Sequence, residues 1–211
     1  MSVGQQYWAL GNAIVVDQNQ FGANLRIKLP VDLYAQYGKI SESGSITDKD
    51  EFNSKDVDYY GGQAVYKQEG WSAGVLGGMI NDNSAVDNSP YVFGVFADAT
   101  FGALSLVGEL DFFGGSVSPT VDAAGTQIWG KAKYAFTPAA WIGLDGWYAG
   151  SENATDKMQL TGIGDSDSFS LADRGPFNTD ILPLNGIAGA MGGATSNICL
   201  LYTSPSPRDR S

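Results

Sequence analysis

A regular alternation of apolar and polar residues between positions 91 and 113 constrains the fold most strongly. On either side of the short turn 101–103, every second residue is apolar or glycine, and the residues between them include Asp98, Glu109 and Asp111. A period of two residues is typical of β-strands. The stretch therefore predicts an antiparallel hairpin with one apolar and one charged face.

The length of these runs fits a membrane. Each has about 11 residues, and strands tilted near 40° with a rise of about 3.4 Å per residue would climb roughly 28 Å, close to the apolar thickness of a bilayer. A strand of a soluble β-sandwich also alternates, so the hairpin alone leaves both alternatives open. A membrane-spanning helix over residues 91–108 would place Asp98 in the middle of the span, and we reject it.

The same alternation predicts further strands along the chain. We expect them at residues 21–29, 33–40, 57–66, 71–79, 127–136 and 141–149, with a less clear strand near 5–9 that leads into a loop at 17–20. Short connections at 30–32, 67–70, 101–103 and 137–140 alternate with long polar ones at 41–56, 81–90, 115–125 and from 150 onward. Outer-membrane barrels sort their connections in this way, whereas a soluble Greek-key sandwich has no reason to do so.

Aromatic residues lie at both ends of the predicted apolar faces, as two lipid–water interfaces would select. The predicted aromatic girdles consist of Tyr66, Trp71, Phe101 and Phe136 at the short-turn end, and Tyr60, Tyr91, Phe112 and Tyr148 at the long-loop end. We therefore predict an all-β fold, an antiparallel up-and-down transmembrane β-barrel.

These hairpins, together with the stretch from Gly4-Gln5-Gln6 to Leu10-Gly11, resemble large Gram-negative outer-membrane porins, including an alginate-export-like group. The resemblance covers residues 4 to about 150. It implies a location in the bacterial outer membrane and a closed, water-filled barrel for passive diffusion of small polar or ionic solutes.

About eight or nine strands are predicted, which is too few for such a channel, so the chain is expected to be an incomplete barrel whose parent has about 16 to 18 strands. We expect residues 1–149 to form the partial barrel and 150–198 a long loop or a partial following strand. The residues that follow Met1 do not have the features of an export signal. Residues 199–211 resemble a translated sequencing adaptor, so the chain is interpreted as truncated at both ends.

Residues opposite the apolar faces are predicted to line the pore. They are Arg26, Lys28, Asp98, Glu109, Asp111, Lys131, Lys133 and Asp145. Pairing Gly114 with Thr126 would place Glu109 directly across from Lys131. These charges would either form a transverse field that orients solutes, or simply hydrate the lumen and pair with one another. Both alternatives stay open.

Composition excludes several functions. The chain has 23 acidic and 12 basic side chains, a formal charge of −11 and no basic stripe, which argues against nucleic acid as a partner. It has no histidine, so triad hydrolysis and imidazole-ligated zinc are not expected, and we predict neither an enzyme nor a cofactor. The expected partners are outer-membrane lipid and small polar solutes, and a homo-oligomer stays open.

Two loops raise narrower questions. An acidic cluster (Asp48, Asp50, Glu51, Asp56 and Asp58) has partial calcium-loop spacing but lacks the required glycine, so a solvated loop is favoured over a metal site. Residues Ile181–Met191 mix apolar residues with glycine and are a hypothetical inward-folding segment. The alternative function is a secreted, soluble β-sandwich that binds glycans through exposed Trp and Tyr side chains.

Overall fold

The computed structural model of the chain describes residues 1–12, 15–41, 56–82, 88–137, 140–150, 156–160 and 198–204. Within these ranges the chain forms strands and no helix. The strands are β1 (Ser2–Ala9), β2 (Asp17–Ile27), β3 (Val31–Ser41), β4 (Val57–Gln68), β5 (Trp71–Asp82), β6 (Ser89–Phe101), β7 (Leu104–Ser118), β8 (Val121–Thr137), β9 (Ala140–Gly150), β10 (Lys157–Gln159) and β11 (Ile198–Ser204).

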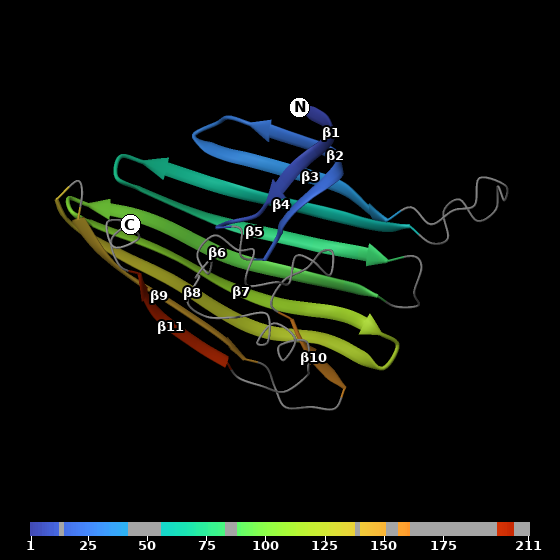
Figure 1. Cartoon of the computed structure of the whole chain (residues 1–211). Coiled ribbons are helices and arrows are strands. Elements are labelled where there is room, and N and C mark those ends of the chain that lie inside the picture. Colours follow the sequence, from blue (N-terminus) through green and yellow to red (C-terminus); the bar gives the residue numbers. More distant parts are fainter. Residues whose placement is uncertain are drawn as a thin grey trace.

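All of these strands belong to one sheet, in which β1 to β9 follow each other in chain order and every neighbouring pair is antiparallel. Strand β11 pairs with β9, and the short β10 pairs parallel with β8. The sheet is open, with β1 and β11 as its edges (Figure 1). The predicted all-β and antiparallel architecture is therefore confirmed, and the sheet is not closed. In the ranges given above, no helix is long and apolar enough to span a membrane.

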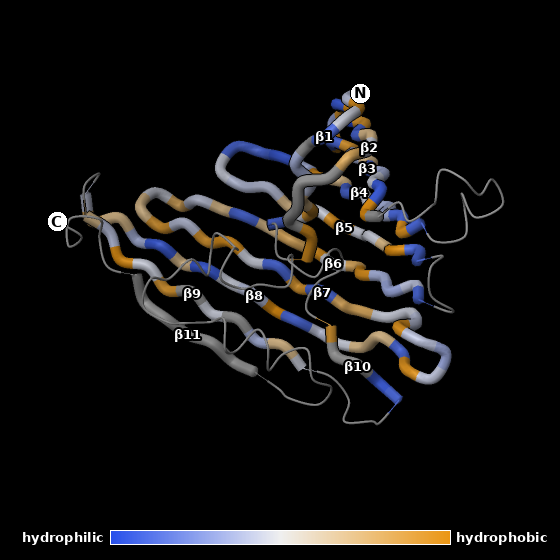
Figure 2. The backbone as a smooth tube through the Cα atoms, turned by 45° about the vertical axis from the view of Figure 1, so that its right-hand side comes forward, coloured by the Kyte–Doolittle hydropathy of each residue, from blue (hydrophilic) through white to orange (hydrophobic). Residues whose placement is uncertain are grey.

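The strand period sorts side chains onto two faces, because successive residues of a strand point to opposite sides. We call the face that carries Val75, Phe93, Val95, Ile128 and Leu144 the apolar face, and all five of these side chains are exposed. The opposite face, which we call the inner face, carries the buried residues of the same strands. Apolar and polar positions alternate along the middle strands of the sheet in Figure 2.

Short turns join the strands at one end of the sheet, at residues 28–30, 69–70 and 102–103, and β8 ends and β9 begins at this same end. We call this the short-turn end and the other the long-loop end. The predicted long loop 115–125 is wrong, because β7 runs to Ser118 and β8 starts at Val121. Ladder hydrogen bonds join backbone groups and do not require apolar side chains, so this Gly- and Ser-rich stretch extends the hairpin. Val117 also packs against the core.

The predicted loop at 17–20 is wrong as well. These residues belong to β2 and pair with β1, where Asn19 lies opposite Tyr7 and Asp17 opposite Ala9. The connection between β1 and β2 is instead residues 10–16. The end of this hairpin crosses in front of the sheet (Figure 1).

The hydrophobic core lies between that hairpin and the inner face of the sheet. Trp8, Leu10, Val15 and Val16 are completely buried, and they belong to one cluster with residues of β4 to β8. From the sheet, the cluster includes Tyr59, Val65, Leu76, Ile80, Val92, Phe96, Phe113 and Ala123. The buried apolar side chains of the sheet therefore lie on the inner face, whereas the side chains of the apolar face are exposed.

The chain beyond β9 contributes two more strands. Strand β10 pairs with residues 122–124 of β8, and Leu160 N then donates a hydrogen bond to the carbonyl oxygen of Ala124. Strand β11 pairs with β9 from Ile198 opposite Ala149 to Ser204 opposite Gly143. Most of β11 lies in the segment interpreted as adaptor-derived. Its pairing does not test that origin, because the edge of a sheet accepts any extended chain.

Candidate pore-lining face

The predicted pore-lining residues lie at positions of the inner face. Arg26, Asp98, Glu109, Asp111, Lys131, Lys133 and Asp145 alternate with residues of the apolar face on β2, β6, β7, β8 and β9, and Lys28 follows β2 directly. In the register of β8 and β9, Lys131 lies opposite Asp145.

The predicted pair of Glu109 and Lys131 is wrong. Strand β7 is shifted by two residues against β8, so Phe112 rather than Gly114 lies opposite Thr126. Glu109 then faces Trp129, and Lys131 faces Val107. Two features cause the shift: the turn lies at residues 119–120, and the register changes by one residue between Ser116 and Ser118. A shift of two residues keeps each side chain on its own face, whereas a shift of one would have exchanged the faces.

Two carboxylates are buried at the middle of the inner face. Glu109 is 3% exposed and Asp111 is 1% exposed. Glu109 Oε2 accepts a hydrogen bond of 2.6 Å from the backbone N–H of Asn12, and Asp111 Oδ2 accepts one of 2.9 Å from Gln127 Nε2. Because a buried carboxylate needs donors, these bonds hold the two acids in place. Sequence analysis did not identify Asn12 or Gln127 as part of this site.

Removing the Gln127 amide tests the Asp111 site. We expect Gln127→Ala to lower the free energy of unfolding by about 1–3 kcal/mol, because a completely buried donor to a carboxylate is lost. Urea unfolding in phospholipid vesicles would measure the change. The matched control is Gln5→Ala, since Gln5 is exposed on β1. Equal losses in the two variants would contradict the assignment of this bond.

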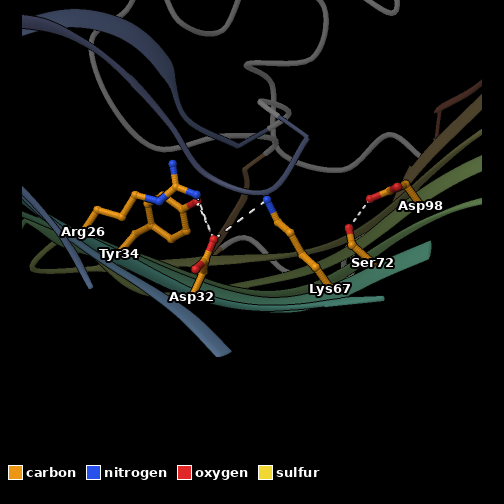
Figure 3. A network of polar contacts seen from close by, with 6 residues as sticks. All are labelled: Arg26, Asp32, Tyr34, Lys67, Ser72 and Asp98. Atoms are coloured by element: carbon orange, nitrogen blue, oxygen red, sulfur yellow. Dashed lines mark hydrogen bonds and ion pairs between the residues drawn. The ribbon is translucent and has the colours of Figure 1, made fainter. Parts of the chain in front are cut away.

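Cationic groups gather at the short-turn end of the inner face (Figure 3). Arg26 Nη2 lies 2.8 Å from Asp32 Oδ2, and Lys67 Nζ lies 3.9 Å from the same oxygen. The Arg26 guanidinium also lies 4.8 Å from the centre of the Tyr34 ring. One carboxylate thus serves two cations, which leaves this cluster with a net positive charge.

The neighbouring strands add one group of each sign. Ser72 donates a hydrogen bond to Asp98, and Lys133 Nζ lies 4.7 Å from the centre of the Trp141 ring. Contact with a ring face stabilises an ammonium group without neutralising it. The Trp141 ring therefore stabilises the Lys133 side chain on the inner face.

Acidic groups predominate at the long-loop end. Lys39 Nζ forms an ion pair of 2.7 Å with Asp56, and Asp58, Asp82 and Asp122 lie at the same end of their strands. Asp58 and Asp122 occupy positions of the apolar face, because they lie an even number of residues from Tyr60 and Ile128, respectively. The cluster of net positive charge on the inner face therefore lies at the short-turn end.

All eight predicted girdle residues are exposed on the apolar face. Tyr66 and Trp71 meet edge to face at the short-turn end, with ring centres 5.7 Å apart, and Tyr60 packs against Tyr37 at 5.4 Å near the long-loop end. Aromatic pairs of this kind stabilise the ends of adjacent strands. Tyr37 was not among the residues predicted for the girdles.

Other predicted features fall partly or wholly outside the described residues. Of the acidic cluster, only Asp56 and Asp58 are described, and the segment Ile181–Met191 is not. Where the structure describes the chain, no group of three or more His, Cys, Asp or Glu side chains could hold a metal ion.

Comparisons with known proteins do not add a family. No protein-family model matches the chain, and no curated protein or solved structure is similar to it. The functional assignment therefore depends on the two faces of the sheet.

Proposed function

We propose that the chain forms part of the wall of an outer-membrane channel through which small polar or ionic solutes diffuse passively. The observation that carries this proposal is the exposed apolar face. It continues across nine consecutive strands, and β2 to β9 are 11 to 17 residues long, whereas a membrane-crossing strand needs about 9–11 residues.

Lipid is the partner that suits such a surface. Soluble monomers rarely expose a continuous apolar patch larger than a few hundred Å². The aromatic side chains at both ends of this face suit the two lipid–water interfaces, and the charged inner face suits a water-filled lumen. Closure of the wall would come from further strands or from further copies of the chain.

Partitioning between water and lipid tests the proposal on the chain itself. We expect the folded chain to require detergent micelles or phospholipid vesicles, and the full-length channel to give discrete conductance steps in planar bilayers. A chain that is monomeric and soluble without detergent would contradict the proposal. That result would favour the soluble glycan-binding alternative.

Lysine on the inner face provides a test of selectivity. We expect Lys131→Ala in the full-length channel to raise the cation-to-anion permeability ratio by about twofold, because one positive charge leaves the lumen. Reversal potentials in a salt gradient would measure this ratio. Asp58→Asn, which removes a charge at an apolar-face position of β4 and keeps the acceptor of the Tyr37 hydroxyl, is the control. An unchanged ratio in Lys131→Ala would mean that the inner charges only hydrate the lumen.

A further inference from the structure

The connection between β1 and β2 is folded against the inner face. We call its described residues, 10–12 and 15–16, the tip. Leu10, Val15 and Val16 are completely buried, and Leu10 N donates a hydrogen bond of 3.3 Å to the carbonyl oxygen of Val16. A connection between two membrane strands would ordinarily extend into water. This one is packed as a core element.

Hydrogen bonds attach the tip to two strands that lie well apart in the sheet. Gly11 N donates to Gln63 Oε1 on β4 over 2.8 Å, and Asn12 N donates to Glu109 Oε2 on β7 over 2.6 Å. Asn12 Nδ2 also donates to the carbonyl oxygen of Gly108 over 3.3 Å. Strands β5 and β6 separate β4 from β7, so the tip reaches across the inner face, as Figures 1 and 2 both show.

The fit at Gly11 is close. Its φ is +55°, in the left-handed region that favours glycine. A Cβ atom at this position would lie 2.5 Å from Glu109 Oε2 and 2.6 Å from Leu76 Cδ2. Only glycine therefore lets the backbone approach β5 and β7 so closely, and its N–H group remains available to Gln63.

From this geometry we infer that the tip is the constriction that limits which solutes pass. The inference rests on the proposed channel function. If the inner face lines the lumen, a segment attached to both β4 and β7 occupies part of the cross-section at mid-height. The tip would then set the conductance and the largest solute that can pass, with Gln63 and Glu109 as its positioning residues.

Shortening the connection tests this inference directly. Ala9 lies opposite Asp17, so an Asn-Gly pair in place of residues 10–16 would close the hairpin with a two-residue turn. In the full-length channel we expect the single-channel conductance to rise at least about twofold and larger sugars to enter channel-containing vesicles. Circular dichroism and heat-modifiable migration in SDS would show whether this variant folds.

A cysteine variant keeps the test decisive if the shortened hairpin does not fold. Asn12→Cys would be made with Cys199→Ser, because Cys199 is the one cysteine of the sequence. A bulky, charged thiol reagent should then reduce the conductance by about half or more. The control is Phe21→Cys, also with Cys199→Ser, because Phe21 is 64% exposed on the apolar face and its modification should leave the conductance unchanged.

The outcomes separate the two proposals. If the unmodified channel conducts but neither the shortened hairpin nor modification of Asn12→Cys alters its conductance, the constriction is overturned and the channel stands. If the unmodified full-length protein does not conduct at all, both proposals are overturned. A change in either variant, with Phe21→Cys unaffected, supports the constriction.

Discussion

Val95→Arg is expected to destabilise the protein in a bilayer by about 2–4 kcal/mol, although Val95 is already 40% exposed. Val95 lies near the middle of β6 on the apolar face, opposite Val75 on β5 and Leu110 on β7. If lipid covers this face, the substitution places a guanidinium near the bilayer midplane. Urea unfolding of the protein in phospholipid vesicles would measure the loss.

The same substitution separates the membrane from the soluble alternative. On a face exposed to water, an arginine at a partly exposed position would change the free energy of unfolding by about 0.5 kcal/mol or less. Gln68→Arg provides a matched control, since Gln68 is exposed at the short-turn end of β4, where an arginine in a barrel would cost about 0–1 kcal/mol. If Val95→Arg is no more harmful than Gln68→Arg, the apolar face does not contact lipid.

Sequence reasoning predicted the strands and their faces well because the signal for both is local. Alternation placed Val95, Phe112 and Ile128 on one face, and all three are exposed there. It also placed Glu109 and Asp111 on the opposite face, where both are buried. A side chain's face depends only on its position along its own strand, so neighbouring strands need not be known.

The register between β7 and β8 could not be predicted in the same way. It depends on where the turn lies, and the polar stretch from Gly114 to Gly125 offers several turn positions. Pairing of β7 with β8 resumes at Ser116 and Ser118, and Pro119 and Thr120 form the connection. Backbone hydrogen bonds leave no signature in the hydrophobic pattern.

The tip was missed for a different reason. Its contacts are long-range, and Asn12 and Glu109 are 97 residues apart in the chain. A local signal did exist, since Leu10, Val15 and Val16 place apolar side chains in a connection where a solvated loop would carry polar ones. Apolar side chains in a connection indicate that the connection is buried. The sequence alone does not identify the residues that cover it.

Trp8→Ala is expected to have the largest effect on stability, a loss of about 3–5 kcal/mol, because it empties a large and completely buried site. The Trp8 ring meets Tyr59 edge to face with ring centres 5.7 Å apart, and it covers Gly22, where a Cβ atom would lie 2.6 Å from the ring. The Tyr59 hydroxyl donates to Gln36 Oε1, whose amide in turn donates to the carbonyl oxygen of Ala9. Trp8 therefore holds the first hairpin against the inner face.

The matched control for this variant is Tyr7→Ala, which removes an aromatic ring from the same strand. Tyr7 is 56% exposed on the opposite face, so its loss should lower the free energy of unfolding by about 1 kcal/mol or less. If Trp8→Ala and Tyr7→Ala are equally stable in urea, the first hairpin does not pack on the inner face. In that case the core between hairpin and sheet, and with it the tip, would not exist in the folded protein. A loss confined to Trp8→Ala would instead show that the packing of this hairpin is a main source of the sheet's stability.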